Sequence, residues 1–179
     1  MVIRFLTHFA FNFTLPPHTR AKENGCPWTE TTFALAAGEG HLEVVQWAWE
    51  HNCPWNEGTC SEAAVGGHLG VLMWLREHGC PWDSETCVNA AVGGHLEVLK
   101  WAREHHCSWD EYTCAAAAGH GQLETLKWVR KHYCPWDTMT CAAAARGGQL
   151  EVLKWRGSTT ARGARRLVRP PLGAGTWRC

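Results

Sequence analysis

Hydrophobic residues between positions 80 and 110 follow two helical patterns separated by glycines. In the second pattern, Leu96, Leu99 and Ala102 recur at the three-residue spacing of one buried helix face, while the charged residues between them point elsewhere. This spacing predicts a helix from His95 to about His105. The alanine-rich stretch before it predicts a shorter helix that ends at Gly93-Gly94, because glycine adopts the left-handed conformation that terminates a helix at little cost.

A polar residue marks the predicted start of each first helix. Asp83 precedes the alanine-rich stretch, where a side-chain oxygen can accept hydrogen bonds from the unpaired N–H groups of the first helical turn. Asn56, Asp110 and Asp137 hold the equivalent position elsewhere in the chain. The two helices and the glycine turn between them therefore form a helix-turn-helix hairpin.

The hairpin pattern recurs every 27 residues along most of the chain. One cysteine series and two tryptophan series mark the repeat: Cys26, Cys53, Cys80, Cys107 and Cys134; Trp28, Trp55, Trp82, Trp109 and Trp136; Trp47, Trp74, Trp101, Trp128 and Trp155. A hairpin of about 22 ordered residues cannot bury its apolar face alone, so it must stack on its neighbours. The sequence predicts an all-α solenoid of stacked helix-turn-helix hairpins over residues 21–155, between an irregular segment at 1–20 and a basic tail at 156–179.

One segment of the repeat points to a known family. The run A-A-V-G-G-H-L-E-V-L-K-W, from Ala90 to Trp101, resembles the ankyrin repeat segment A-A-x-x-G-H-x-E-I-V-K-L, and Thr86 sits close to where that family's T-P-L-H begins. The resemblance covers roughly Pro27 to Trp155. The period of 27 residues differs from the 33 of ankyrin, and C-P-W-D replaces the projecting hairpin finger. The pattern resembles the Cys-Pro-Trp-Asp subgroup of ankyrin-like repeats in large DNA viruses and protists, which implies shortened connections and protein binding along a concave surface.

The last 24 residues keep no position of the repeat and contain six arginines: Arg156, Arg162, Arg165, Arg166, Arg169 and Arg178. As encoded, these residues form a basic tail, and one interpretation is that the tail binds nucleic acid. Restoring one base after the Trp155 codon lets the neighbouring frame encode A-R-E-H-D-C-P-W-G-A-T-T-C-A-A-A-A-R-G-G-H-L-E-V, whose cysteines fall in register with the repeat. We therefore interpret residues 156–179 as an out-of-frame remnant of a further repeat.

Charge is unevenly distributed, although 17 basic residues balance 17 acidic ones in the whole chain. Up to Trp155 the chain is net acidic by about six charges. Nucleic-acid grooves need basic residues along the phosphates, so we interpret both tryptophan series as packing between hairpins, with each indole N–H directed to a backbone carbonyl. The segment from Phe5 to Leu15 is too short to span a membrane and too polar for a good signal peptide. We expect neither a nucleic-acid nor a membrane partner.

Nine of the ten cysteines belong to the repeat, the second series being Cys60, Cys87, Cys114 and Cys141 together with the five given above. Cysteines of one series lie one repeat apart, about the 8–10 Å of packed helices, which exceeds the Cα separation that a disulfide tolerates. Pairs between the two series, such as Cys53 with Cys60, are compatible with the spacing. We expect reduced, buried cysteines that behave as small apolar residues, and a cytoplasmic, reducing location.

Candidate ligands and catalytic groups are weak. His51, Cys53 and Cys60 recur as a set, but the close C-x2-4-C pairs typical of zinc sites are missing, so we predict no metal and no cofactor. His41, His68 and His95 become Gln122 and Gln149 in later repeats, and glutamine cannot exchange protons, so a polar role at the helix start fits both residue types. The chain contains no G-x-x-x-x-G-K-[ST], G-x-S-x-G or H-E-x-x-H motif, and we expect no enzyme.

We predict a protein-protein interaction module that binds its partner along an extended repeat surface. Its contact residues are the first-helix positions where the repeats differ: Glu30, Glu57, Ser61, Glu62, Ser84, Glu85, Asn89, Glu111, Tyr112, Thr138 and Met139. This mixed, partly acidic set suits a protein or basic-peptide partner. The alternatives are a metal- or redox-responsive cysteine-rich array and a truncated, non-functional fragment of a longer repeat gene. We expect a monomer unless the exposed C-terminal end of the array self-associates.

Overall fold

The computed structural model describes residues 28–155, and every regular element in this range is an α-helix. The helices form successive pairs: α3 (Glu30–Gly38) and α4 (Leu42–Glu50), α5 (Glu57–Val65) and α6 (Leu69–Glu77), α7 (Ser84–Gly93) and α8 (Leu96–Glu104), α9 (Glu111–Gly119) and α10 (Leu123–Lys131), and α11 (Thr138–Arg146) with helical residues at 150–155. The predicted all-α helical repeat is confirmed for this range. The predictions for residues 1–20 and 156–179 lie outside the described residues.

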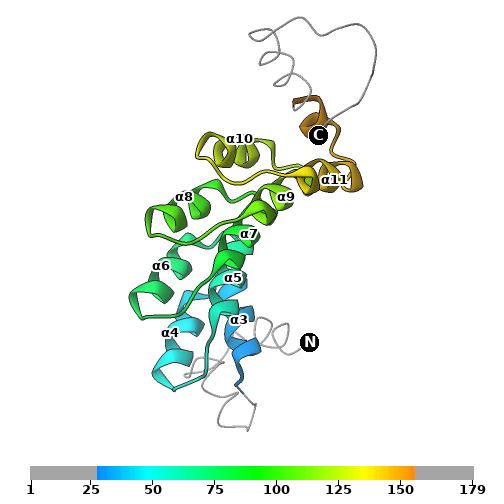
Figure 1. Cartoon of the computed structure of the whole chain (residues 1–179). Coiled ribbons are helices and arrows are strands. Elements are labelled where there is room, and N and C mark those ends of the chain that lie inside the picture. The colour runs from blue at the N-terminus through cyan, green and yellow to red at the C-terminus, as the bar shows by residue number, and fades with distance from the viewer. Residues whose placement is uncertain (1–27, 156–179) are drawn as a thin grey trace, which may run out of the picture.

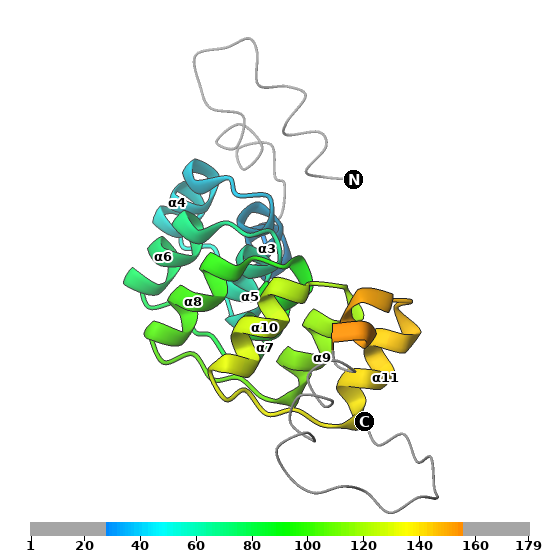
Figure 2. The same ribbon diagram turned by 90° about the horizontal axis from the view of Figure 1, so that it is seen from above.

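The helices are arranged in two layers that follow the order of the chain (Figure 1). The first helices α3, α5, α7, α9 and α11 pack side by side in one layer, and α4, α6, α8 and α10 form the other. The view from above shows the same two layers, with the connections between pairs running along one edge (Figure 2). Each pair thus contacts chiefly the pair before it and the pair after it.

The predicted helix boundaries are confirmed by the caps. Asp83 is the N-cap of α7, and its Oδ1 accepts from the Glu85 N–H at 3.0 Å; Asp110 and Asp137 act in the same way on α9 and α11. Gly94 follows α7 with φ 73°, so it supplies the left-handed turn into α8.

In the last three repeats, the histidine or glutamine before the second helix joins one pair to the preceding pair. His95 Nε2 lies 3.0 Å from the Val65 carbonyl, and Gln122 and Gln149 each donate an Nε2–H to the carbonyl 30 residues earlier, at 3.3 Å. The predicted polar role is therefore filled by a bond between repeats, because neither His95 nor Gln122 caps its own helix. Histidine and glutamine interchange here since both present an N–H donor at the same reach.

The core lies between the layers, where Leu72, Leu75, Leu99, Leu126 and Phe33 are fully buried. Leu99 and Ala102 lie on the buried face of α8, as predicted. Leu96 is only half-buried, while Val98 is buried at 2% exposure, because α8 is covered both by its own first helix and by the neighbouring pairs. A single three-residue spacing therefore predicts too few buried positions on a helix that is packed on more than one side.

Candidate protein-binding surface

The predicted contact residues lie on the layer of first helices, whose exposed residues, with the residue before each helix, we call the first-helix face. Seven of the predicted residues are exposed on it: Glu30, Glu57, Glu62, Glu85, Tyr112, Thr138 and Met139. Ser84, Asn89 and Glu111 are half-buried. Ser61 is only 6% exposed, so a partner could not reach it in this arrangement. Its predicted place on the contact surface is wrong, because α5 packs between α3 and α7.

Negative charge gathers on the first-helix face. The first helices and their N-cap residues include eight carboxylates and one basic residue, Arg146: Glu30, Glu57, Glu62, Asp83, Glu85, Asp110, Glu111 and Asp137. The second helices α4, α6, α8 and α10 balance six basic residues against six acidic ones. Two of their pairs, Glu97 with Lys100 and Glu124 with Lys127, form ion pairs at 2.6 Å. Most of the net negative charge of the described residues therefore lies in the layer of first helices.

Large apolar side chains interrupt this acidic face. Tyr112 is 57% exposed on α9, and Met139 is 46% exposed at the equivalent position of α11, which packs against α9. In the earlier repeats the equivalent residues are Thr31, Gly58 and Glu85. This position of the first-helix face is therefore polar or glycine in the earlier repeats and apolar in α9 and α11. Leu35, 44% exposed on α3, was not predicted, because its position reads as part of an alanine-rich helix.

An arginine holds the junction between successive pairs, a role that the sequence analysis did not identify. The Arg103 guanidinium lies 4.1 Å from the ring centroid of Trp109 and donates to the Cys107 carbonyl. Arg76 and Trp82 repeat the arrangement one unit earlier, with a separation of 4.3 Å. Arg130 extends it to the following unit. The signal in the sequence is the 27-residue spacing of these three arginines.

The two tryptophans of each unit pack against one another at the same edge. Trp82 and Trp101 meet edge to face at 5.8 Å, and the His105 ring stacks on Trp101 at 4.2 Å while its Nδ1 lies 2.8 Å from the Trp101 carbonyl. Both indoles are half-buried against the core. The predicted packing role is confirmed for these residues, but within the described residues neither indole N–H reaches a carbonyl.

Seven of the repeat cysteines among the described residues are buried, as predicted, whereas Cys53 is half-buried. Cys60, Cys80 and Cys87 are 0% exposed, and Cys107 and Cys134 are 1% exposed. They meet in pairs between the two series. The thiol of Cys60 is hydrogen-bonded to that of Cys80, and this contact together with burial raises the pKa of Cys60. The sequence spacing also allowed Cys60 to pair with Cys53, but in the structure Cys60 contacts Cys80 instead.

The same contact makes the two thiols of a pair unequal. The hydrogen bond to Cys107 and burial raise the pKa of Cys87, whereas the hydrogen bond from Cys87 and the nearby Arg103 guanidinium lower the pKa of Cys107. One thiol of the pair therefore ionises more readily because the other donates to it.

The described residues contain no group of three or more His, Cys, Asp or Glu side chains that could hold a metal ion. None of the helices within residues 28–155 is long and apolar enough to cross a membrane. Comparison of the sequence with protein-family models and with curated proteins gives no match.

Proposed function

We propose that the chain is an ankyrin-like solenoid of the Cys-Pro-Trp-Asp subgroup and that it binds another protein along the first-helix face. The observation that supports this proposal is the segregation of charge between the two helix layers. The first helices and their N-cap residues hold eight carboxylates and one basic residue, while the second helices taken together hold equal numbers of acidic and basic residues. Surface charge that is not neutralised within the molecule attracts a partner of opposite charge.

The partner that fits this surface is a basic, extended protein segment. Lysine or arginine side chains would meet the carboxylates of α5, α7 and α9, and an apolar side chain of the partner would pack on Tyr112 and Met139. Tyrosine is enriched among the residues that dominate binding energy at protein interfaces. The exposed carboxylates would govern the rate of association and its salt dependence more than the final affinity.

Selection of random displayed peptides against the reduced full-length chain tests this proposal. We expect the selected peptides to be rich in lysine and arginine, to contain an apolar anchor, and to bind more weakly as salt concentration rises. The double variant Glu85→Lys with Glu111→Lys and the single variant Tyr112→Ala should each weaken their binding at least tenfold.

A matched control separates the first-helix face from net charge alone. The double variant Glu97→Lys with Glu124→Lys makes the same change of charge on α8 and α10, outside the first-helix face, and should retain most of the affinity. Peptides that bind the first-helix variants as tightly as the unaltered chain, or that lose binding to the control variant instead, would contradict the proposal.

A further inference from the structure

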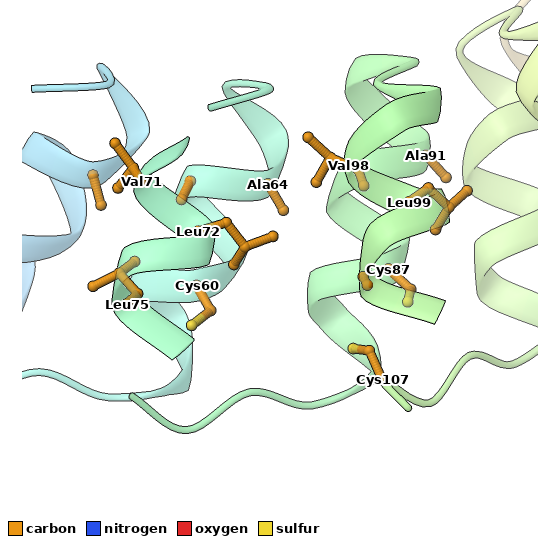
Figure 3. Packing of buried hydrophobic residues seen from close by; sticks show 14 of the residues in the cluster. Cys60, Ala64, Val71, Leu72, Leu75, Cys87, Ala91, Val98, Leu99 and Cys107 are labelled. Carbon is orange, nitrogen blue, oxygen red and sulfur yellow. The ribbon is translucent and has the colours of Figure 1, made fainter. Parts of the chain in front are cut away.

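Three buried thiol pairs link the first helix of one unit to the segment that opens the next. Cys60 pairs with Cys80, Cys87 with Cys107, and Cys114 with Cys134, each pair separated by 20 residues in sequence. Figure 3 shows Cys107 on the connecting segment beside the start of α7, which contains Cys87. The pairing recurs at each of these junctions, so it is a property of the repeat rather than of one site.

The position of each pair is fixed by further contacts. Cys107 Sγ donates to the Asp83 carbonyl at 3.2 Å and Cys134 Sγ to the Asp110 carbonyl at 3.3 Å, both of them N-cap residues of first helices. The Arg103 guanidinium is bonded to the carbonyl of Cys107 itself. Each pair is thus held between a helix start and the arginine of the junction.

We propose that these thiol pairs form three intrachain disulfides, Cys60–Cys80, Cys87–Cys107 and Cys114–Cys134, by exchange with a small disulfide such as glutathione disulfide. This inference is independent of the proposed binding function, because all six cysteines are buried and lie off the first-helix face.

The exchange proceeds in two balanced steps. The thiolate of one cysteine attacks a sulfur of glutathione disulfide, forming a mixed disulfide and releasing one glutathione thiolate, which takes up a proton. The second cysteine of the pair loses its proton and attacks the protein sulfur of the mixed disulfide, releasing the second glutathione. The pair loses two protons and two electrons, which convert one glutathione disulfide into two molecules of reduced glutathione.

The local chemistry favours the first step. The lowered pKa of Cys107, caused by the hydrogen bond from Cys87 and by the Arg103 guanidinium, increases the fraction of the attacking thiolate. Burial opposes it, because the reagent reaches the thiols only when a junction opens locally. The rate of oxidation should therefore report how often each junction opens, and closing the disulfide should hold that junction shut.

The experiment uses the full-length chain, reduced and then equilibrated under native conditions in glutathione buffers of increasing oxidised fraction. Intact-mass measurement counts the hydrogens lost, and peptide mapping without reductant identifies the linked cysteines. We expect cross-links Cys60–Cys80, Cys87–Cys107 and Cys114–Cys134, a higher melting temperature than the reduced chain, and reversal of both effects by dithiothreitol.

Two variants test the pairing. The double variant Cys87→Ala with Cys107→Ala should lose only the Cys87–Cys107 cross-link. A melting curve of the reduced variant serves as the control that its array is folded. The single variant Cys87→Ala should instead leave Cys107 bound to glutathione. Cross-links between other partners such as Cys53 and Cys60, thiols that stay reduced at every buffer ratio, or cross-links that form only after unfolding in denaturant would overturn the proposal.

Discussion

One residue in each connection turns the chain through left-handed backbone. Asn52, Gly79, His106 and Tyr133 occupy equivalent positions and have φ of 55°, 83°, 66° and 62°. Glycine and asparagine tolerate this conformation, whereas a bulky side chain is strained in it. Tyr133 is 92% exposed and packs on little that could offset the strain. All four connections share the left-handed turn, so the extra strain at position 133 comes from the bulky tyrosine side chain.

Replacing Tyr133 with the asparagine found at the equivalent position, Tyr133→Asn, should stabilise the chain by about 0.5–1 kcal/mol, because it relieves left-handed strain and exposes no core. Urea unfolding of the two chains measures the difference. The reverse change, Asn52→Tyr, should lower stability by a similar amount. A loss of stability in Tyr133→Asn would show that the tyrosine makes a contact that its exposure conceals.

Single residues could be predicted from the sequence where one local interaction decides their place. Asp83 is an N-cap and Gly94 a left-handed turn, as predicted, because capping and glycine geometry depend only on neighbouring residues. Ser61 was misplaced, since its burial depends on the helices on either side of α5. Side-chain burial on a helix packed from several directions is not fixed by its own periodicity.

At the scale of the helix pair, the glycine in the turn is contacted by a side chain of the next pair. A Cβ at Gly94 would lie 2.3 Å from Gln122 Oε1, whereas a Cβ at the equivalent Gly148 would meet nothing within 4 Å. Both glycines have positive φ, at 73° and 68°. The two sites therefore share the same backbone strain and differ only in whether a following side chain packs against them.

Gly94→Ala should destabilise the chain by about 2–3 kcal/mol, combining left-handed strain with loss of the hydrogen bond from Gln122 to the Val92 carbonyl. Gly148→Ala should cost about 1 kcal/mol, from strain alone. Chemical denaturation of both variants measures the difference, which isolates the contact between pairs. Equal losses would mean that the Gln122 side chain moves aside without consequence.

The arginine at each junction gives a second prediction at this scale. Arg103→Lys should lower stability by about 1 kcal/mol, because a lysine keeps the charge but not the planar contact with Trp109 or the hydrogen bond in its present geometry. Lys100→Ala on the same helix removes a largely exposed ion pair and should change stability by less than about 0.5 kcal/mol. Thermal melts of both variants make the comparison, and a smaller effect at Arg103 than at Lys100 would contradict it.

Hairpins and their boundaries were predictable because the period, the caps and the glycines agree. The junction was not, since the Arg103–Trp109 contact and the Cys87–Cys107 pair each join residues of successive units. The 27-residue spacing shows that both residues of such a contact recur from unit to unit. It does not show in which unit a given residue finds its partner. Cys60 could be paired with Cys53 or with Cys80 on spacing alone, and only the path of the connection decides between them.

At the scale of the whole molecule, each pair of helices contacts chiefly its neighbours, so the effect of a change should depend on its place in the stack. Trp101 belongs to an inner pair of the stack and packs on Trp82 and His105 of its own unit. Trp101→Ala should destabilise by about 3 kcal/mol, the lower end for tryptophan because the ring is half-buried. Trp28→Ala, at the first described position, should have a smaller effect on the melting temperature. Equal effects would indicate a single cooperative core.

The helical repeat was predictable from the 27-residue period, and the partly acidic character of the first-helix positions was recognised, but the separation of charge between the two layers was not. The net acidic balance up to Trp155 was visible in the sequence. Its concentration in one layer appears only once α5, α7 and α9 lie side by side and the second helices are seen to hold as many basic as acidic residues in total. A surface is a property of several helices together.

Because every junction uses the same contacts, the number of hairpins can change without requiring a new kind of interface between pairs. Removing residues 84–110 would join Asp83 directly to Glu111, leave Arg76 on Trp82, and bring Gln122 to the place beside Gly67 that His95 now fills. The shortened chain should fold with a helical circular dichroism spectrum and a lower melting temperature. Unequal recombination between repeats would therefore change the copy number of the unit while keeping the protein foldable, and with it which first-helix residues are neighbours.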